Sequence, residues 1–213
     1  MPDSIREVVE GVSEFQRRAY PERKDLFSAL AKGQDPKVLF LTCADSRVDP
    51  TRVTQSPPGR LFVFRNLGNI VPPESASDDS VTATIEFVTG VVHVEDIIIC
   101  GHSDCGAMRA LLAPTNPKTP AISAWLRYAE AARNSADTNR EGDRLLRAVT
   151  EQNIILQLEN LATYPAIAAR VASGELALHG WLYDIGSGAV DMYDAGARRF
   201  VPLLDTEHST AAG

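Results

Sequence analysis

Apolar residues in this chain fall into two patterns, short unbroken runs and longer stretches in which apolar positions recur every three or four residues. An unbroken run of about four to eight apolar residues indicates a strand buried on both faces, whereas the longer spacing indicates a helix that packs along one side. The runs predict a sheet of four or five strands. They lie at 37–42, 61–65, 96–100, 176–183 and 189–193, and a hairpin at 186–188 joins the last two.

Helical spacing covers most of the remaining chain. Because predicted strands and helices alternate, the fold class is α/β, with a mainly parallel central sheet flanked by helices. We interpret residues 1–35 as an N-terminal helical arm, 36–205 as the α/β domain and 206–213 as a flexible tail. The predicted helices span 4–32 with a break at Pro21, 79–89, a segment that begins at Met108, 121–134, 142–164 and 165–173.

Composition and charge narrow the class of protein. The chain has 213 residues, 44% of them hydrophobic and 23% charged, so it can bury a core without help from a metal. The net charge is −7 and basic residues are scattered, which excludes nucleic acid and anionic membranes as expected partners. The N-terminus is polar, no apolar run could span a bilayer, and three cysteines suit a reducing compartment. We therefore expect a cytoplasmic protein.

Two of the predicted strands end in residues that bind metals. Cys43 follows the first run, and His102 and Cys105 follow the third. Two thiolates and one imidazole suit Zn²⁺, and three protein ligands leave a fourth position for water or substrate, as in catalytic sites. If the two strands are neighbours, their carboxyl ends bring the three residues together. We predict one catalytic Zn²⁺ per chain, with Cys100 as a buried structural thiol.

Asp45 and Arg47 lie in the turn directly after Cys43. A guanidinium can hold a carboxylate in a bidentate pair and keep it ionised. Asp45 then has two possible roles. It accepts a hydrogen bond from zinc-bound hydroxide and orients it, or it binds the metal as a fourth ligand and closes the site.

The segments Cys43–Arg47 and Gly101–Gly106 together resemble the β-class carbonic anhydrase family, in its plant-type branch. The resemblance covers roughly residues 26–194. It extends to Phe62–Asn69, Ile85–Phe87 and His179–Asp184.

The resemblance implies an enzyme that interconverts carbon dioxide and bicarbonate, with zinc-bound hydroxide as nucleophile, in a homodimer or a dimer of dimers. It assigns Cys43, His102 and Cys105 as zinc ligands, and Asp45 and Arg47 as a catalytic dyad. Gln34 matches a glutamine that donates to the substrate. The residues that match the apolar substrate pocket are Phe62, Leu67, Phe87 and Gly106.

Two departures from the family pattern bear on regulation and on the pocket. Phe87 stands where plant-type members carry Tyr, and Phe40 stands where bicarbonate-regulated members carry Trp. Arg65 and Tyr183 match the rest of that regulatory site. We expect an open zinc site near neutral pH and no inhibition by bicarbonate.

Two other functions fit the same residues. Hydrolysis of carbonyl sulfide or carbon disulfide can use the same ligands and carboxylate, and side-by-side turnover assays separate these linear substrates. A zinc-stabilised, non-catalytic domain would need a fourth protein ligand and would unfold on chelation. Trp125 and Trp181 are interpreted as packing residues.

Overall fold

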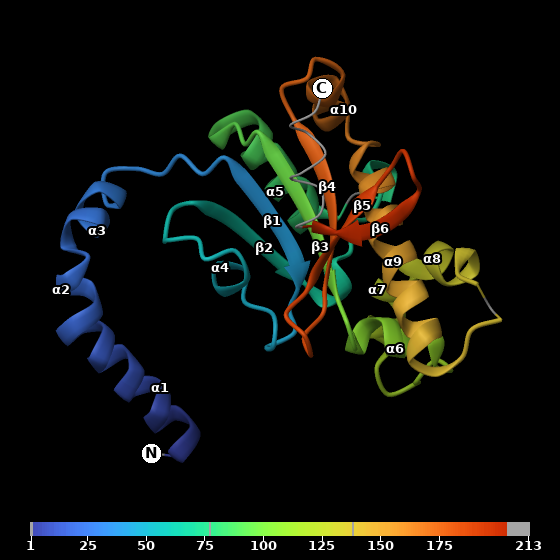
Figure 1. The fold of residues 1–213 in the computed structure, drawn as a ribbon, viewed down its shortest axis with the longest axis horizontal. Coiled ribbons are helices and arrows are strands. Elements are labelled where there is room, and N and C mark those ends of the chain that lie inside the picture. The colour runs from blue at the N-terminus through green and yellow to red at the C-terminus, as the bar shows by residue number, and fades with distance from the viewer. Residues whose placement is uncertain (1, 77, 138, 204–213) are drawn as a thin grey trace. The chain divides into compact units, whose positions relative to one another are not determined.

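A six-stranded sheet in the order β2-β1-β3-β4-β5-β6 organises the part of the chain that follows residue 35 (Figure 1). The structure is a computed structural model and describes residues 2–76, 78–137 and 139–203. β1 to β4 run parallel, and β5 and β6 are antiparallel additions at one edge. The strands are β1 (Val38–Cys43), β2 (Leu61–Asn66), β3 (Asp96–His102), β4 (Ala177–Tyr183), β5 (Val190–Asp194) and β6 (Arg199–Pro202).

The mainly parallel α/β class is confirmed, and the sheet has six strands where four or five were predicted. β6 has only four residues and ends at Pro202. Short strands that carry proline are tolerated at a sheet edge, where one row of backbone groups needs no partner. Such a segment lacks the unbroken apolar run that identified the buried strands. The predicted tail, 206–213, lies outside the described residues.

The chain divides into two compact units, Met1–Asp35 and Pro36–Gly213. The first unit holds α1 (Asp3–Glu14), a π-helical turn (Phe15–Ala19), α2 (Tyr20–Glu22) and α3 (Lys24–Leu30). The second unit adds α4 (Pro50–Val53), α5 (Asp79–Phe87), α6 (Gly106–Leu112), α7 (Pro120–Leu126), α8 (Glu130–Ser135), α9 (Gly142–Leu161) and α10 (Pro165–Ala172). None of the helices within the described ranges has both the length and the apolar composition needed to cross a bilayer.

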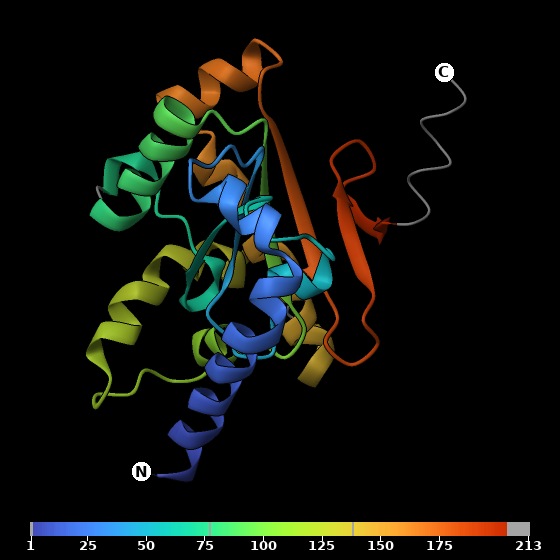
Figure 2. The ribbon, with the colours of Figure 1, turned by 90° about the vertical axis from the view of Figure 1, so that its left-hand side faces the viewer.

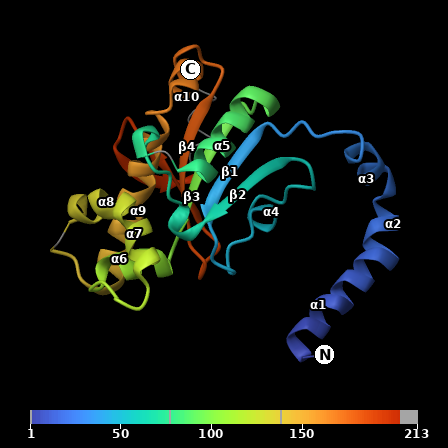
Figure 3. The same cartoon turned by 180° about the vertical axis from the view of Figure 1, so that it is seen from behind.

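The two faces of the sheet are buried differently. Figure 3 shows α5 and α9 lying over the strands, and Figure 2 places α5 on one side and α4 on the other. On the helical face, Leu39 and Ile97 pack with Ile85 of α5 and Ile154 of α9. The opposite face holds a smaller cluster made only of strand residues, namely Phe40, Ile98 and Cys100 with Val38, Leu61, Trp181 and Tyr183.

β1 and β3 are neighbours, as the metal prediction requires. Their parallel register pairs Thr42 with Cys100, so both strands end at the same edge. The chain leaves β1 toward β2 on one side and reaches β3 on the other, which makes this edge a switch point in strand order. Ligand sites of open α/β sheets form at such points.

Candidate metal centre

Three ligand atoms converge at the carboxyl edge of the sheet. Cys43 is the last residue of β1, His102 is the last residue of β3, and Cys105 is the N-cap of α6. All three residues are buried, and their ligand atoms lie within 4.8 Å of one another. The two Sγ atoms are 4.0 Å apart. Two sulfurs at about 2.3 Å from one tetrahedral zinc would be about 3.8 Å apart, so the spacing fits.

The His102 ring is oriented as a ligand. Its Nδ1 lies 2.8 Å from the Ser103 carbonyl oxygen, and a carbonyl only accepts, so Nδ1 carries the proton. In the neutral imidazole, Nε2 is then the nitrogen with the free lone pair, and it is buried without a hydrogen-bond partner in the described part of the chain. A buried polar atom without a partner is costly. A divalent cation between Nε2 and the two sulfurs would satisfy it, and this donor set suits Zn²⁺.

The two thiols differ sharply in acidity. The pKa of Cys43 is lowered to about 4, mainly because the Cys105 thiol donates to its sulfur, with further help from the Gly68 N–H. The pKa of Cys105 is raised, because it supplies that shared proton and is buried. The shared proton therefore favours Cys43 as the more acidic thiol of the pair. The Gly68 N–H lies 3.4 Å from Cys43 Sγ, a contact that no pattern in the sequence indicated.

Asp45 and Arg47 form the bidentate pair expected from the sequence. Arg47 Nε donates to Asp45 Oδ1 at 2.9 Å, and Nη2 donates to Oδ2 at 2.8 Å. The backbone N–H of Arg47 also donates to Oδ1, which closes a tight turn. These bonds hold the pKa of Asp45 well below its usual range. Oδ2 lies 3.9 Å from Nε2 of His102, so the ionised carboxylate borders the ligand cluster.

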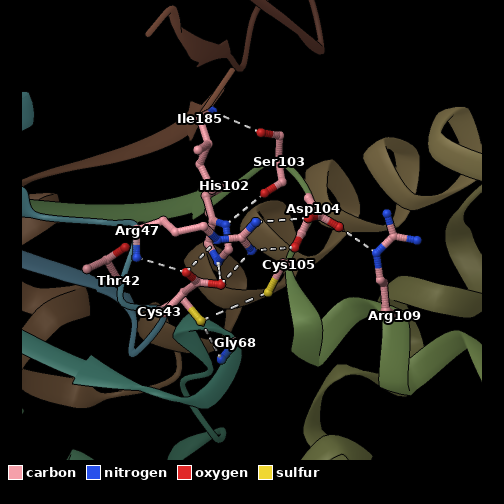
Figure 4. Close-up of polar contacts among 12 residues, drawn as sticks. Thr42, Cys43, Arg47, Gly68, His102, Ser103, Asp104, Cys105, Arg109 and Ile185 are labelled. Atoms are coloured by element: carbon pink, nitrogen blue, oxygen red, sulfur yellow. Dashed lines mark hydrogen bonds and ion pairs between the residues drawn. The ribbon is translucent and has the colours of Figure 1, made fainter. Parts of the chain in front are cut away.

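Asp104 holds the other side of the Arg47 guanidinium (Figure 4). Arg47 Nη1 donates to Asp104 Oδ2 at 2.9 Å, and Nη2 donates to the Asp104 backbone carbonyl at 3.0 Å. Arg109 binds the second oxygen of Asp104. Asp104 has a φ of 55°, a left-handed conformation that aspartate tolerates better than most residues. The guanidinium is therefore fixed from both sides and cannot leave Asp45 without breaking several bonds.

Arg65 braces the turn that carries Cys43. Its Nε donates to the Cys43 carbonyl oxygen at 3.1 Å, and its Nη2 donates to that of Asp45 at 2.6 Å. The sequence associated Arg65 only with a regulatory anion site. In the structure, its N–H groups instead donate to backbone carbonyls of the turn that follows β1. The position of Arg65 in β2 alone does not predict these contacts.

The predicted substrate residues lie in different places. Phe62 and Phe87 contact each other, with ring centroids 5.7 Å apart. Leu67 and Gly106 stand beside the ligand turns, next to Gly68 and Cys105. Gln34 belongs to the first unit of the chain. The roles of these five residues remain predictions.

Comparisons with known proteins agree on one family. A family model described as "Carbonic anhydrase" matches residues 38–190. A curated relative from Pseudomonas aeruginosa, named "Carbonic anhydrase", is 46% identical over 212 residues, which cover 98% of this chain and 96% of the relative.

Two solved structures are also similar. One is described as "the beta-carbonic anhydrase CcaA", with a TM-score of 0.90 and 41% identity over 93% of this chain and 99% of that chain. The other belongs to a pair of tetrameric beta-carbonic anhydrases from Sordaria macrospora, with a TM-score of 0.82 and 27% identity over 90% of this chain and 97% of that chain.

Proposed function

The chain belongs to the β-class carbonic anhydrases and is a carbonic anhydrase, and from this premise we propose how its residues perform the reaction. Cys43, His102 and Cys105 hold one Zn²⁺, and the enzyme hydrates carbon dioxide reversibly to bicarbonate and a proton. The observation that carries the proposal is the buried Nε2 of His102, which has no hydrogen-bond partner among the described residues and shares a 4.8 Å cluster with two thiols.

The residues around this cluster fit an open site. Zinc, when bound, lowers the pKa of a water molecule toward about 7, so that hydroxide is available at neutral pH. The cluster comprises three ligand residues of the described chain. Both oxygens of Asp45 accept from Arg47 instead. We therefore favour Asp45 as an orienting group over Asp45 as a fourth ligand.

Asp45 accepts a hydrogen bond from the nucleophile through Oδ2, the oxygen nearest His102. Because Arg47 keeps the pKa of Asp45 low, the carboxylate remains an acceptor throughout the neutral range. Asp104 keeps Arg47 in place and so maintains the direction of the carboxylate. This arrangement turns a lone pair of the nucleophile toward the substrate before the substrate arrives.

Carbon dioxide is small and apolar, so an apolar wall suits it. We assign the Phe62–Phe87 pair and Leu67 to such a surface, and Phe87 offers no hydroxyl to bind competing water. Gly106 begins α6, where backbone N–H groups lack partners within the helix and can face an oxyanion. The assignment of Gln34 to the substrate rests on the family resemblance alone, because Gln34 belongs to the first unit of the chain.

We propose a homodimer or a dimer of dimers. β2 is an edge strand of the sheet, and edge strands present backbone groups that pair readily with another chain. Val63, Leu67 and Phe87 are exposed apolar residues in this part of the chain. The Sordaria macrospora neighbours are tetrameric by their description. A cytoplasmic location fits three cysteines that form no disulfide.

The test combines stopped-flow hydration of carbon dioxide with metal analysis of the same sample, and turnover of carbonyl sulfide and carbon disulfide in parallel. We expect one zinc per chain and rapid hydration. Hydrolysis of carbon disulfide with negligible hydration would overturn the substrate assignment. One zinc per chain without turnover of any of these substrates would point to a structural metal.

A further inference from the structure

Three amide side chains on α9 face the loop between β2 and α5. Asn153 and Gln157 are fully buried, and Asn160 follows one turn later. We call these three residues the amide ladder, because Gln157 Nε2 donates to Asn153 Oδ1 at 2.9 Å and Asn160 Nδ2 donates to Gln157 Oε1 at 3.3 Å. Buried amide groups almost always have hydrogen-bond partners. The remaining donors and acceptors of the ladder therefore need partners outside α9.

The ladder holds the backbone of residues 68–71. Asn153 Nδ2 donates to the Gly68 carbonyl at 3.0 Å, and Gln157 Oε1 accepts from the Val71 N–H at 2.8 Å. Asn160 Nδ2 donates to the Val71 carbonyl at 2.7 Å. The loop is thus fixed from α9 at both of its ends.

Gly68 is the point where this loop meets the metal centre. Its N–H donates to Cys43 Sγ at 3.4 Å, a contact drawn in Figure 4. Its φ of 79° is left-handed, and a Cβ there would lie 2.9 Å from the Cβ of Ala107. Only glycine brings its backbone this close without strain.

A second helix fixes the same N–H. The Leu67 carbonyl and the Gly68 N–H belong to one planar peptide and point in opposite directions. Trp125 Nε1 of α7 donates to that Leu67 carbonyl at 2.8 Å. The peptide is therefore held by an indole at one end and by a sulfur at the other, and hydrogen bonds in such a chain strengthen one another.

We propose that Trp125 and Asn153 are positioning residues of the metal centre, which act by fixing the Gly68 N–H on the Cys43 thiolate. The inference rests on the proposed zinc site. Two thiolates neutralise most of the charge of a divalent cation. A hydrogen bond to one sulfur withdraws electron density from it and leaves the cation more electrophilic. Outer partners of metal ligands commonly act in this way.

The wild-type protein loaded with cadmium-113 tests the central contact directly. We expect a scalar coupling between the cadmium nucleus and the Gly68 amide proton, transmitted through sulfur and the hydrogen bond. Cadmium bound at one equivalent without this coupling would overturn the inference and leave the zinc site intact. A chain that binds neither cadmium nor cobalt would overturn the zinc site itself, and the positioning role with it.

Trp125→Phe removes the indole N–H and keeps an aromatic ring. In the cobalt-substituted variant we expect the thiolate-to-metal charge-transfer band at longer wavelength, a weaker Gly68 coupling in the cadmium form, and roughly 10-fold lower metal affinity. Asn153→Leu, which removes the bond to the Gly68 carbonyl, should move the band in the same direction.

Trp181→Phe is the matched control. Its indole N–H has no hydrogen-bond partner among the described residues, and its ring packs on Phe40 at the other face of the sheet. Its cobalt spectrum should equal that of the wild type. Equal spectra for Trp125→Phe and Trp181→Phe would remove Trp125 from the metal centre, even if both variants lose stability.

Discussion

Cys43 and Cys100 are both buried cysteines near the ends of neighbouring strands, yet they belong to chemically different regions. Thr42 pairs with Cys100 in the register, so Cys43, one residue later, points to the opposite face of the sheet. Cys43 packs with Cys105 and Met108. Cys100 packs with Phe40 and Ile98 in the cluster made of strand residues.

The pKa values of the two thiols show how the surroundings of Cys43 and Cys100 differ chemically. Burial raises the pKa of Cys100 to about 12, whereas the pKa of Cys43 is lowered to about 4 although its side chain is also buried. Cys43 receives hydrogen bonds from Cys105 and from the Gly68 N–H. Burial alone therefore makes a cysteine inert, whereas hydrogen-bond donors supplied by turns favour the thiolate form that can bind a metal.

Replacing each cysteine in turn gives the largest contrast. Cys43→Ala should lower zinc affinity by more than about 100-fold, beyond the loss expected for an outer partner, and should abolish hydration. Cys100→Ala should retain one zinc per chain and near-normal activity. Metal analysis after dialysis, with stopped-flow hydration, measures both. Stoichiometric zinc in Cys43→Ala would remove Cys43 from the ligand set.

Asp45→Asn tests whether the carboxylate next to Cys43 is needed for catalysis but not for zinc binding. The amide is nearly isosteric but presents only one acceptor oxygen and cannot keep the charge-assisted pair with Arg47. We expect normal zinc content and a hydration rate lower by about 10²–10⁴-fold, the range for a positioned acid–base group. Full activity in a zinc-loaded Asp45→Asn would exclude the carboxylate from the mechanism. A crystal at pH 7.5 in which Asp45 binds the metal would contradict the open site.

The sequence predicted that Cys43, His102 and Cys105 come together, because they follow unbroken apolar runs. Cys43 and His102 each follow such a run, and the structure confirms that the two strands are neighbours. β6 could not be predicted in the same way, because its four residues carry no such run. The Gly68 N–H is a backbone group, so its bond to sulfur depends on a loop conformation that residue types do not encode one by one.

The contacts of Arg65 and of the amide ladder could not be predicted from the sequence for the same reason. A polar residue within a helical pattern predicts solvent exposure, but Asn153 is fully buried because its partner is a backbone carbonyl 85 residues away in sequence. Contacts of this kind arise from packing between elements. They appear only once α9 is placed against the loop after β2.

Arg65→Met tests the brace on the metal turn with a smaller expected effect. The change frees the carbonyls of Cys43 and Asp45, so we expect roughly 10-fold faster zinc transfer to a chelator, and a partial effect for Arg65→Lys. Arg60→Met is the control, because Arg60 precedes β2 at the end far from the metal turn. Identical transfer rates for the Arg60 and Arg65 variants would show that the turn holds its shape without the brace.

The smallest expected effect is a pH dependence of the free energy of unfolding. It is caused by Cys100, in the cluster of strand residues on the sheet face opposite α5 and α9. The folded protein keeps the Cys100 proton up to a pKa of about 12, whereas the unfolded chain releases it near about 8.5. Between these values the folded state binds more protons, so the free energy of unfolding falls as pH rises.

From pH 7.5 to 9.5 the zinc-loaded wild type should lose about 1 kcal/mol of unfolding free energy relative to Cys100→Ala. Urea unfolding at both pH values measures this difference, in which the other titrating groups cancel. Parallel changes in the two proteins would mean that the Cys100 face is more hydrated than its burial indicates, and the contrast with Cys43 would then rest on hydrogen-bond donors alone.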